Sequence, residues 1–228
     1  MNRKWICVIS LMLVFIILLV GCQTNNTSDN LQKELEEKNK RIAELEKRIE
    51  ELESQLDVSN ETKESLLYIT VEVINAIKTK DFNKLAGFVH PTKGLRFSPY
   101  DNIDIETSNV FTADEVKNLL KDDKVYMWGH YDGSGEPIEL NFSDYYEKFI
   151  YDADFANPQI IGNNVVVSYG NAIDNIKEIY PESYFIELHF KGLDPKYEGM
   201  DWRSLKLVFE RENDTWYLVA IVHGQWTI

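Results

Sequence analysis

Three runs of residues near the C-terminus determine the fold class of this protein: SYFIELHF at 183–190, SLKLVFER at 204–211 and TWYLVAIVH at 215–223. Each run is rich in β-branched and aromatic residues and alternates with a period of two, which predicts a strand. The three residues at 212–214 predict a tight turn between the last two runs. The end of the chain therefore predicts a sheet of long antiparallel strands.

Helical patterns precede these strands. Apolar residues recur with helical spacing at 65–80, and Asp81 is placed to cap a short second helix that Pro91 would stop. Thr112 and Glu115 have the spacing of a capping box, which opens another helix. Together these patterns predict the α+β class. Weaker signals predict a short helix at 143–149 and strands at 125–129 and 165–169.

The order of these elements resembles the nuclear-transport-factor-two-like, or cystatin-like, fold. The resemblance rests on the long helix, the short helix in KTKDFNKLAGFVHP at 78–91, and the closing DTWYLVAIVHGQW at 214–226, with Trp216 near the start of the last strand. It implies a curved antiparallel sheet packed on a long helix as a cone, over residues 61–228. Dehydratases, isomerases and plain binding modules share this fold, so the fold alone assigns no function.

Residues 1–21 have the features of a secretory signal peptide. Arg3 and Lys4 give a positive start, and residues 6–20 are apolar except for Ser10. This apolar run has the length of a signal-peptide hydrophobic region and is shorter than the roughly 20 residues that a membrane-spanning helix needs. We therefore expect the protein to be exported.

Leu19, Val20, Gly21 and Cys22 resemble the lipobox of bacterial lipoproteins. The resemblance implies that the thiol of Cys22 receives a diacylglyceryl group, that the chain is cleaved just before it, and that acyl chains such as palmitate anchor the protein in the lipid bilayer. The chain also resembles lipoproteins of Gram-positive bacteria, which implies no activity. An uncleaved signal anchor is the alternative. Both interpretations place the protein on the extracytoplasmic face of the cell membrane.

A linker and a helical stalk follow the lipobox. Residues 22–30 are polar, which predicts a flexible linker. Residues 31–58 carry a heptad repeat that predicts a parallel coiled coil and therefore a homodimer. The alternative is a lone solvated helix, stabilised by glutamate–lysine and glutamate–arginine pairs four residues apart. The heptad core positions are Leu35, Ile42, Ile49 and Leu56 in one set, and Leu31, Lys38, Leu45 and Leu52 in the other.

Composition limits the classes of function. Among 228 residues, 24 Lys and Arg stand against 38 Asp and Glu, and a net charge of -14 is repelled by nucleic acids. Cys7 would be removed with the signal peptide and Cys22 would carry lipid, which leaves no cysteine nucleophile. The four histidines lack metal-ligand spacing, and HYDGSGE at 130–136 does not fit a calcium loop. We therefore expect no metal, no cofactor and no nucleic-acid partner.

Two pairs of titratable residues are candidates for proton transfer. Asp152 and Asp154 would share a face if their segment is extended, and could then hold a hard cation or act as an acid–base pair. His189 and His223 could meet inside a cone if both point inward. Solvated or helix-capping aspartates and half-buried histidines are the ordinary alternatives. The period of two puts His189 on one face with Phe185 and Glu187, and His223 on one face with Tyr217, Val219 and Ile221.

Aromatic residues suggest a ligand-binding rim. Trp128, Tyr131, Trp202 and Arg203 lie near predicted loops or strand ends, where a cone opens, although core packing is their ordinary role. Arg96 is a charge in an apolar stretch and either pairs with a buried carboxylate or faces an anionic ligand. No residue is assigned a catalytic role. The candidate ligand-binding residues are Arg96, Trp128, Tyr131, His189, Trp202, Arg203 and His223.

These patterns predict a membrane-anchored envelope lipoprotein whose extracytoplasmic domain binds a protein or a small molecule without evident catalysis. Two alternatives remain. One is a lyase- or isomerase-type enzyme that uses a pocket inside the cone, with a histidine or aspartate as general base. The other is a structural component of an envelope assembly, dimerised by its stalk.

Replacing Cys22 by serine tests the lipid anchor. A serine hydroxyl cannot form the thioether to diacylglycerol, so Cys22→Ser should release the protein from the membrane fraction and abolish labelling with radioactive palmitate. Cys7→Ser, which changes the other cysteine, should keep both properties. Unchanged membrane retention of Cys22→Ser would instead support the uncleaved signal anchor.

Overall fold

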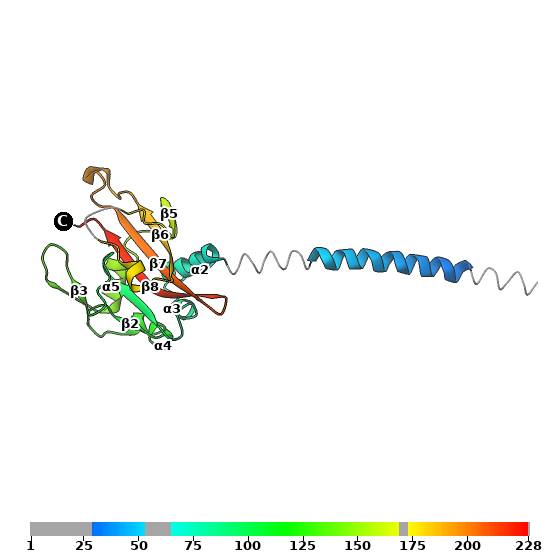
Figure 1. Ribbon diagram of the computed structural model, residues 1–228, viewed down its shortest axis with the longest axis horizontal. Coiled ribbons are helices and arrows are strands. Elements are labelled where there is room, and N and C mark those ends of the chain that lie inside the picture. Colours follow the sequence, from blue (N-terminus) through cyan, green and yellow to red (C-terminus); the bar gives the residue numbers. More distant parts are fainter. Residues whose placement is uncertain (1–28, 53–64, 169–172, 228) are drawn as a thin grey trace, which may run out of the picture. The chain divides into compact units, whose positions relative to one another are not determined.

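A computed structural model describes residues 29–52, 65–168 and 173–227 of the chain (Figure 1). The chain divides into two compact units, Met1–Asn60 and Glu61–Ile228, and we call the second unit the head. The predicted signal peptide and lipobox, most of the linker and the last part of the stalk lie outside the described residues. Within the described residues, no helix is both long enough and apolar enough to cross a membrane.

The described part of the first unit is one helix over residues 29–52. The aliphatic residues at its heptad core positions are 49–62% exposed, so they form an apolar stripe along the helix. The helix agrees with the sequence prediction, whereas self-association through the stripe stays a prediction. Its ion pairs join Lys38 to Glu34, Arg41 to Glu44 and Arg48 to Glu51, at 2.8, 3.0 and 3.2 Å. Only the first has the predicted spacing of four residues.

Six strands in the described part of the head form one sheet in the order β2-β1-β8-β7-β6-β5. The three predicted C-terminal strands are β6, β7 and β8, which pair antiparallel and run side by side in Figure 1. Asn213 and Asp214 join β7 to β8 in a two-residue turn with positive φ at both positions. The strands are β1 (Leu95–Ser98), β2 (Val110–Phe111), β5 (Ile160–Asn163), β6 (Tyr184–Phe190), β7 (Arg203–Glu212) and β8 (Thr215–Gln225).

The sheet differs from the prediction at two places. β1 runs parallel to β8, with Arg96 opposite Ala220, because no hairpin turn joins these distant strands and fixes them as antiparallel. The predicted strand at 165–169 is also wrong, since residues 165–168 form no strand and Tyr169 lies outside the described residues. Here the chain folds back so closely over β5 that a side chain at Gly162 would collide with Val165 and Val167.

Side-chain caps mark the starts of helices α2 to α5 in the head. Ser65 and Asp81 accept backbone hydrogen bonds at the starts of α2 and α3, and Thr112 and Glu115 form the predicted capping box of α4. Asn141 caps α5 in the same way. The helices are α2 (Leu66–Lys78), α3 (Phe82–Ala86), α4 (Ala113–Val116), α5 (Phe142–Phe149) and α6 (Ile176–Ile179), with 3₁₀ turns η1 (Leu119–Lys121) and η2 (Pro195–Tyr197).

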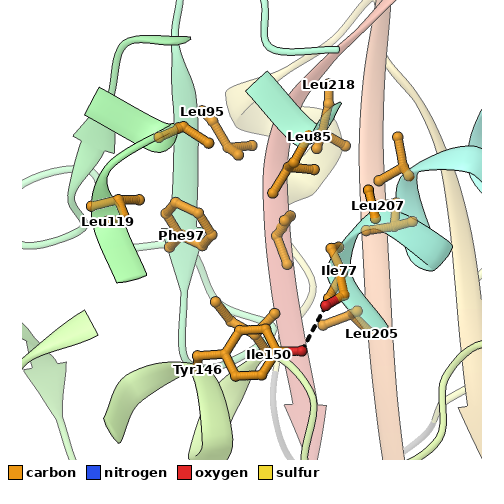
Figure 2. Packing of buried hydrophobic residues seen from close by; sticks show 14 of the residues in the cluster. Ile77, Leu85, Leu95, Phe97, Leu119, Tyr146, Ile150, Leu205, Leu207 and Leu218 are labelled. Carbon is orange, nitrogen blue, oxygen red and sulfur yellow. Dashed lines mark hydrogen bonds between the residues drawn. The ribbon is translucent and has the colours of Figure 1, made fainter. Parts of the chain in front are cut away.

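Aromatic side chains fill the space between the sheet and helices α2, α3 and α5. The rings of Phe97 and Phe142 meet edge to face at 5.4 Å, and those of Trp128 and Tyr145 stack at 3.8 Å. Tyr146 satisfies its buried hydroxyl by donating to the carbonyl of Ile77, as Figure 2 shows. Aliphatic residues of β1, β7 and β8 complete this cluster. The interior of the predicted cone is therefore occupied by the protein's own side chains.

The opposite face of the sheet carries a smaller apolar cluster. Ile103, Ile176 and Tyr180 cover residues of β6, β7 and β8 there. Val219 belongs to this outer cluster although His223 points to the interior, because a β-bulge at Val208 shifts the register of β8 by one residue. The predicted grouping of His223 with Val219 and Tyr217 is therefore wrong. Its grouping with Ile221 is confirmed.

The exposed stripe of the stalk helix leads to a test of self-association. Ile42→Asp together with Ile49→Asp places two carboxylates at heptad core positions, so sedimentation equilibrium of the purified chain should change from a dimer to a monomer. Lys40→Asp together with Lys47→Asp puts the same residues, seven apart, on the solvated side of the repeat and should leave the mass unchanged. Equal masses for the wild type and the Ile42/Ile49 variant would rule out the coiled coil.

Candidate functional site

A groove of about 630 Å³ on the head is lined by four segments that are distant in sequence. They are Tyr100 and Asn102 after β1, residues 130–135 from the end of β3 and the turn after it, Ile173 and Thr227. β3 (Tyr126–His130) and β4 (Pro137–Leu140) form a separate two-stranded sheet, and their connection is a turn that contains Gly133 and Gly135. The fold thus builds a solvent-open concavity from loops and strand ends.

Two tyrosines are fixed in the wall of this groove. The hydroxyl of Tyr100 accepts a hydrogen bond from the backbone N–H of Asp132 at 3.3 Å, and burial raises the pKa of Tyr100. The hydroxyl of Tyr131 accepts from Nζ of Lys148 at 2.9 Å, and the same ammonium lies 4.4 Å from the centre of the Tyr131 ring. Both rings are half-buried, so part of each remains available to a ligand.

A buried ion cluster lies behind the groove, separated from it by Phe149, whose ring contacts Tyr100, Tyr131 and His223. His223 is fully buried; its Nε2 lies 3.1 Å from Oδ1 of Asp152 and its Nδ1 lies 3.2 Å from the carbonyl oxygen of Pro99. Nε of Arg203 donates to the other carboxylate oxygen of Asp152 at 2.7 Å. This cluster ties β7 and β8 to the segment after α5.

The hydrogen bonds of this cluster define its chemistry. The two partners of His223, a carbonyl oxygen and a carboxylate oxygen, are both hydrogen-bond acceptors. Burial alone would raise the pKa of Asp152, but the hydrogen bond and charge of His223 and the charge of Arg203 outweigh it and lower that pKa. The histidine is engaged on both nitrogens and shielded by Phe149. The arrangement therefore holds charge in place and offers no free base to the groove.

A second buried ion cluster lies on the outer face of the sheet. Nζ of Lys206, which is fully buried, donates to Asp101 at 2.6 Å and to Asp174 at 2.7 Å. Burial alone would lower the pKa of Lys206, but the surrounding carboxylates outweigh it and raise that pKa. Gly224 makes room for this cluster, since a side chain there would collide with Asp101. Neighbouring Glu187 is fully buried and accepts two backbone N–H groups, from residues 167 and 168.

The structure separates the residues that were predicted to form a rim. Tyr131 lines the groove. Trp128 does not lie at a rim: it is 1% exposed and donates to the carbonyl of Leu140 from within the aromatic core. Trp202 is also buried, at 5% exposure, and Arg203 is engaged with Asp152. Trp128 packs inside because it lies in the middle of β3, where its ring contacts Phe97, Phe142 and Tyr145.

Arg96 does not pair with a buried carboxylate, which is one of its two predicted roles. Its Nε donates to the hydroxyl of Tyr180 at 3.0 Å and its Nη1 to the hydroxyl of Ser108 at 2.6 Å. Within the described part of the chain, no carboxylate forms an ion pair with it. Neutral hydroxyl groups on the outer face of the sheet therefore satisfy this guanidinium.

The predicted pairs of titratable residues do not form. His189 lies opposite Ser204 and His223 opposite Leu205, and since adjacent residues of β7 point to opposite faces, the two histidines do too. His189 does share its face with Glu187, as predicted, at 3.9 Å. Asp152 and Asp154 also diverge, because the segment bends and Asp154 binds Lys78 at 2.9 Å. Across the residues that the structure describes, no group of three acidic, histidine or cysteine side chains could hold a metal ion.

Sequence reasoning missed Tyr100, Asn102 and the Lys206 cluster. The sequence did contain a signal for the cluster. Glu187 and Lys206 each lie between apolar residues of a predicted strand, and a charge buried at such a position needs a partner. No comparable signal marked Tyr100 or Asn102, since they reach the groove through the folding of a loop.

Comparisons with known proteins add two similar solved structures. No model of a protein family matches the sequence, and no curated protein matches it. A variant of the designed protein Rd1NTF2_05 is 12% identical, with a TM-score of 0.32, over 72% of this chain and 99% of that one. A putative calcium/calmodulin-dependent protein kinase II association domain from Xanthomonas campestris is 10% identical, with a TM-score of 0.31, over 71% and 83%. The head itself has the expected α+β fold, a curved open sheet packed on helices.

The Asp152 cluster leads to a stability prediction. Asp152→Asn leaves Arg203 without its buried counter-charge and should cost roughly 3 kcal/mol of unfolding free energy at neutral pH, measured by urea denaturation. Asp154→Asn, two residues away at an exposed ion pair, is the matched control and should cost much less.

The same pair of variants has an expected pH dependence. The pKa of Asp152 is lower in the folded state than its usual value of 3.8, so the ionised carboxylate stabilises the fold above that pH. This contribution is lost as the pH falls through the folded pKa. The difference between wild type and Asp152→Asn should therefore shrink in acid. A constant difference across this range, or a loss no larger than that of Asp154→Asn, would contradict the assignment.

Proposed function

We propose that this protein is a lipid-anchored extracytoplasmic binding protein whose head holds a ligand in the groove. The observation that carries the proposal is the contrast between two spaces in the head. The interior between sheet and helices is filled by aromatic side chains, whereas the groove is open and lined by polar groups and two fixed tyrosines. A ligand can reach the second space without disrupting the core.

The sequence supports the location. A signal peptide followed by Cys22 in a lipobox puts the anchor at the N-terminus, and the linker and stalk separate that anchor from the head. The acidic chain is repelled by anionic lipid surfaces, so the acyl chains must hold it at the membrane. A head on such a tether can meet ligands outside the cytoplasm.

The alternative of a lyase or isomerase receives less support from the geometry. Such an enzyme needs a general base within reach of a bound substrate. His223, the histidine that points to the interior, is bound on both nitrogens and lies behind Phe149. The groove residue His130 is exposed and has no carboxylate ion pair within the described chain that would orient it. These features support binding over proton-transfer catalysis.

The exposed apolar stripe of the stalk supports a second, compatible role. Aliphatic residues at most heptad core positions favour pairing with a second copy, which would give an envelope component with two heads. This structural role needs no ligand in the groove.

Photo-crosslinking in cells tests ligand binding at the groove. Replacing Tyr131 by p-benzoylphenylalanine puts a crosslinker in the groove wall, and replacing Tyr197, which is 47% exposed in η2, puts the same group on the head outside the groove lining. Irradiation should give a discrete adduct from position 131 that position 197 does not give. The same adducts from both positions, or none from position 131, would contradict the proposal.

A further inference from the structure

The lining of the groove restricts the charge of its ligand. Among the described residues that line it, none is a lysine or arginine, and the charged and titratable groups are Asp132, His130 and the two tyrosines. The nearby ammonium of Lys148 is engaged by Tyr131. The chain as a whole carries a net charge of -14. An anionic ligand would therefore meet the carboxylate of Asp132 within the groove, whereas the ammonium of Lys148 lies outside the described lining.

The lining also restricts the polarity of the ligand. Ile173 is the one aliphatic residue among the described lining residues. An apolar ligand would cover the amide of Asn102 and the hydroxyls of Ser134 and Thr227 without giving them hydrogen bonds, which costs free energy for each group. The groove thus suits a ligand that presents many hydrogen-bonding groups.

The two tyrosines favour a ligand that has a flat apolar surface of its own. Tyr100 and Tyr131 are held by hydrogen bonds from Asp132 and Lys148, so their rings are oriented before a ligand arrives. Sugar rings combine a face of C–H groups, which packs on aromatic rings, with a rim of hydroxyls, which suits amides and hydroxyls. We infer that the groove binds a neutral oligosaccharide, an inference that rests on the proposed binding function and names its ligand class.

The size and construction of the groove fit this class. Its volume of about 630 Å³ lies within the range of roughly 300–1,000 Å³ that small-molecule sites occupy. Asn102 supplies two N–H donors and one acceptor oxygen, and the hydroxyls of Ser134 and Thr227 both donate and accept. Sugar hydroxyls also donate and accept, so each of these groups can be satisfied.

Calorimetric titration tests the inference with defined sugars. The full chain, kept in a detergent that has no sugar head group, is titrated with chitotetraose and, separately, with maltotetraose. Saturable binding of at least one of them is expected. Asn102→Ala and Tyr131→Ala should each weaken it about tenfold. Tyr197→Ala, an exposed tyrosine outside the groove lining, should leave the affinity unchanged.

Asn102 is exposed, so Asn102→Ala should keep the wild-type thermal unfolding midpoint and report on binding alone. Binding of a neutral sugar should also resist a roughly tenfold rise in ionic strength, because salt screens only charged interactions. Spermidine serves as the cationic probe. Saturable binding of spermidine that salt abolishes, without sugar binding, would overturn the inference in favour of a cationic ligand drawn by Asp132.

The proposed function and this inference can fail separately. If position 131 forms its adduct in cells but neither tetrasaccharide binds, the saccharide class is wrong and the groove still binds a ligand. If neither result appears, both are wrong. Equal weakening by Tyr197→Ala would also overturn the inference, because the sugar would then be held outside the groove.

Discussion

The pairing of β7 with β8 is the contact on which both layers of the head depend. Leu205 and Leu207 point from β7 into the aromatic interior, while Lys206 between them points to the outer face. The two-residue turn at 213–214 fixes this register. A slip by one residue would exchange the two faces and drive the ammonium of Lys206 into the aromatic core, away from Asp101 and Asp174. The bulge next to Val208 changes which residues of β8 face each side, so that Leu218 and Ile221 point to the interior and Val219 and Val222 to the outer face.

The two buried ion clusters position the groove. Pro99 accepts from His223, and Asp101 and Asp174 are held by Lys206. These residues alternate with or adjoin Tyr100, Asn102 and Ile173, which line the groove. Ion pairs buried in this way are weak sources of net stability, because desolvation offsets most of their attraction, but they are demanding in geometry. The acidic loops of this head are thereby fixed to the sheet at defined points, and the groove acquires a defined shape although loops build it.

The sequence predicted the parts of the head that local patterns control. Period-two alternation found β6, β7 and β8, the helical spacing of apolar residues found α2, and capping residues found the starts of α3 and α4, because these signals act over a few residues. It failed where distant segments meet. The bulge at Val208 regrouped the neighbours of His223, the parallel pairing of β1 had no local mark, and Trp128 went to the core instead of a rim. Of the seven predicted ligand-binding residues, Tyr131 alone is among the described residues that line the groove. The groove is built from four segments that are distant in sequence, so local patterns could not predict its lining.

The place of Thr227 in the groove has a practical consequence. β8 ends at Gln225, and two residues later Thr227 already lines the groove. Any polypeptide that continues past this point, whether a fusion partner or an affinity tag, starts at the groove and can enter it. Tags on this protein therefore belong in the stalk region or at a remote loop such as the β7–β8 turn. If a chain with a C-terminal tag fails to bind, the tag in the groove explains the loss without any defect in the head.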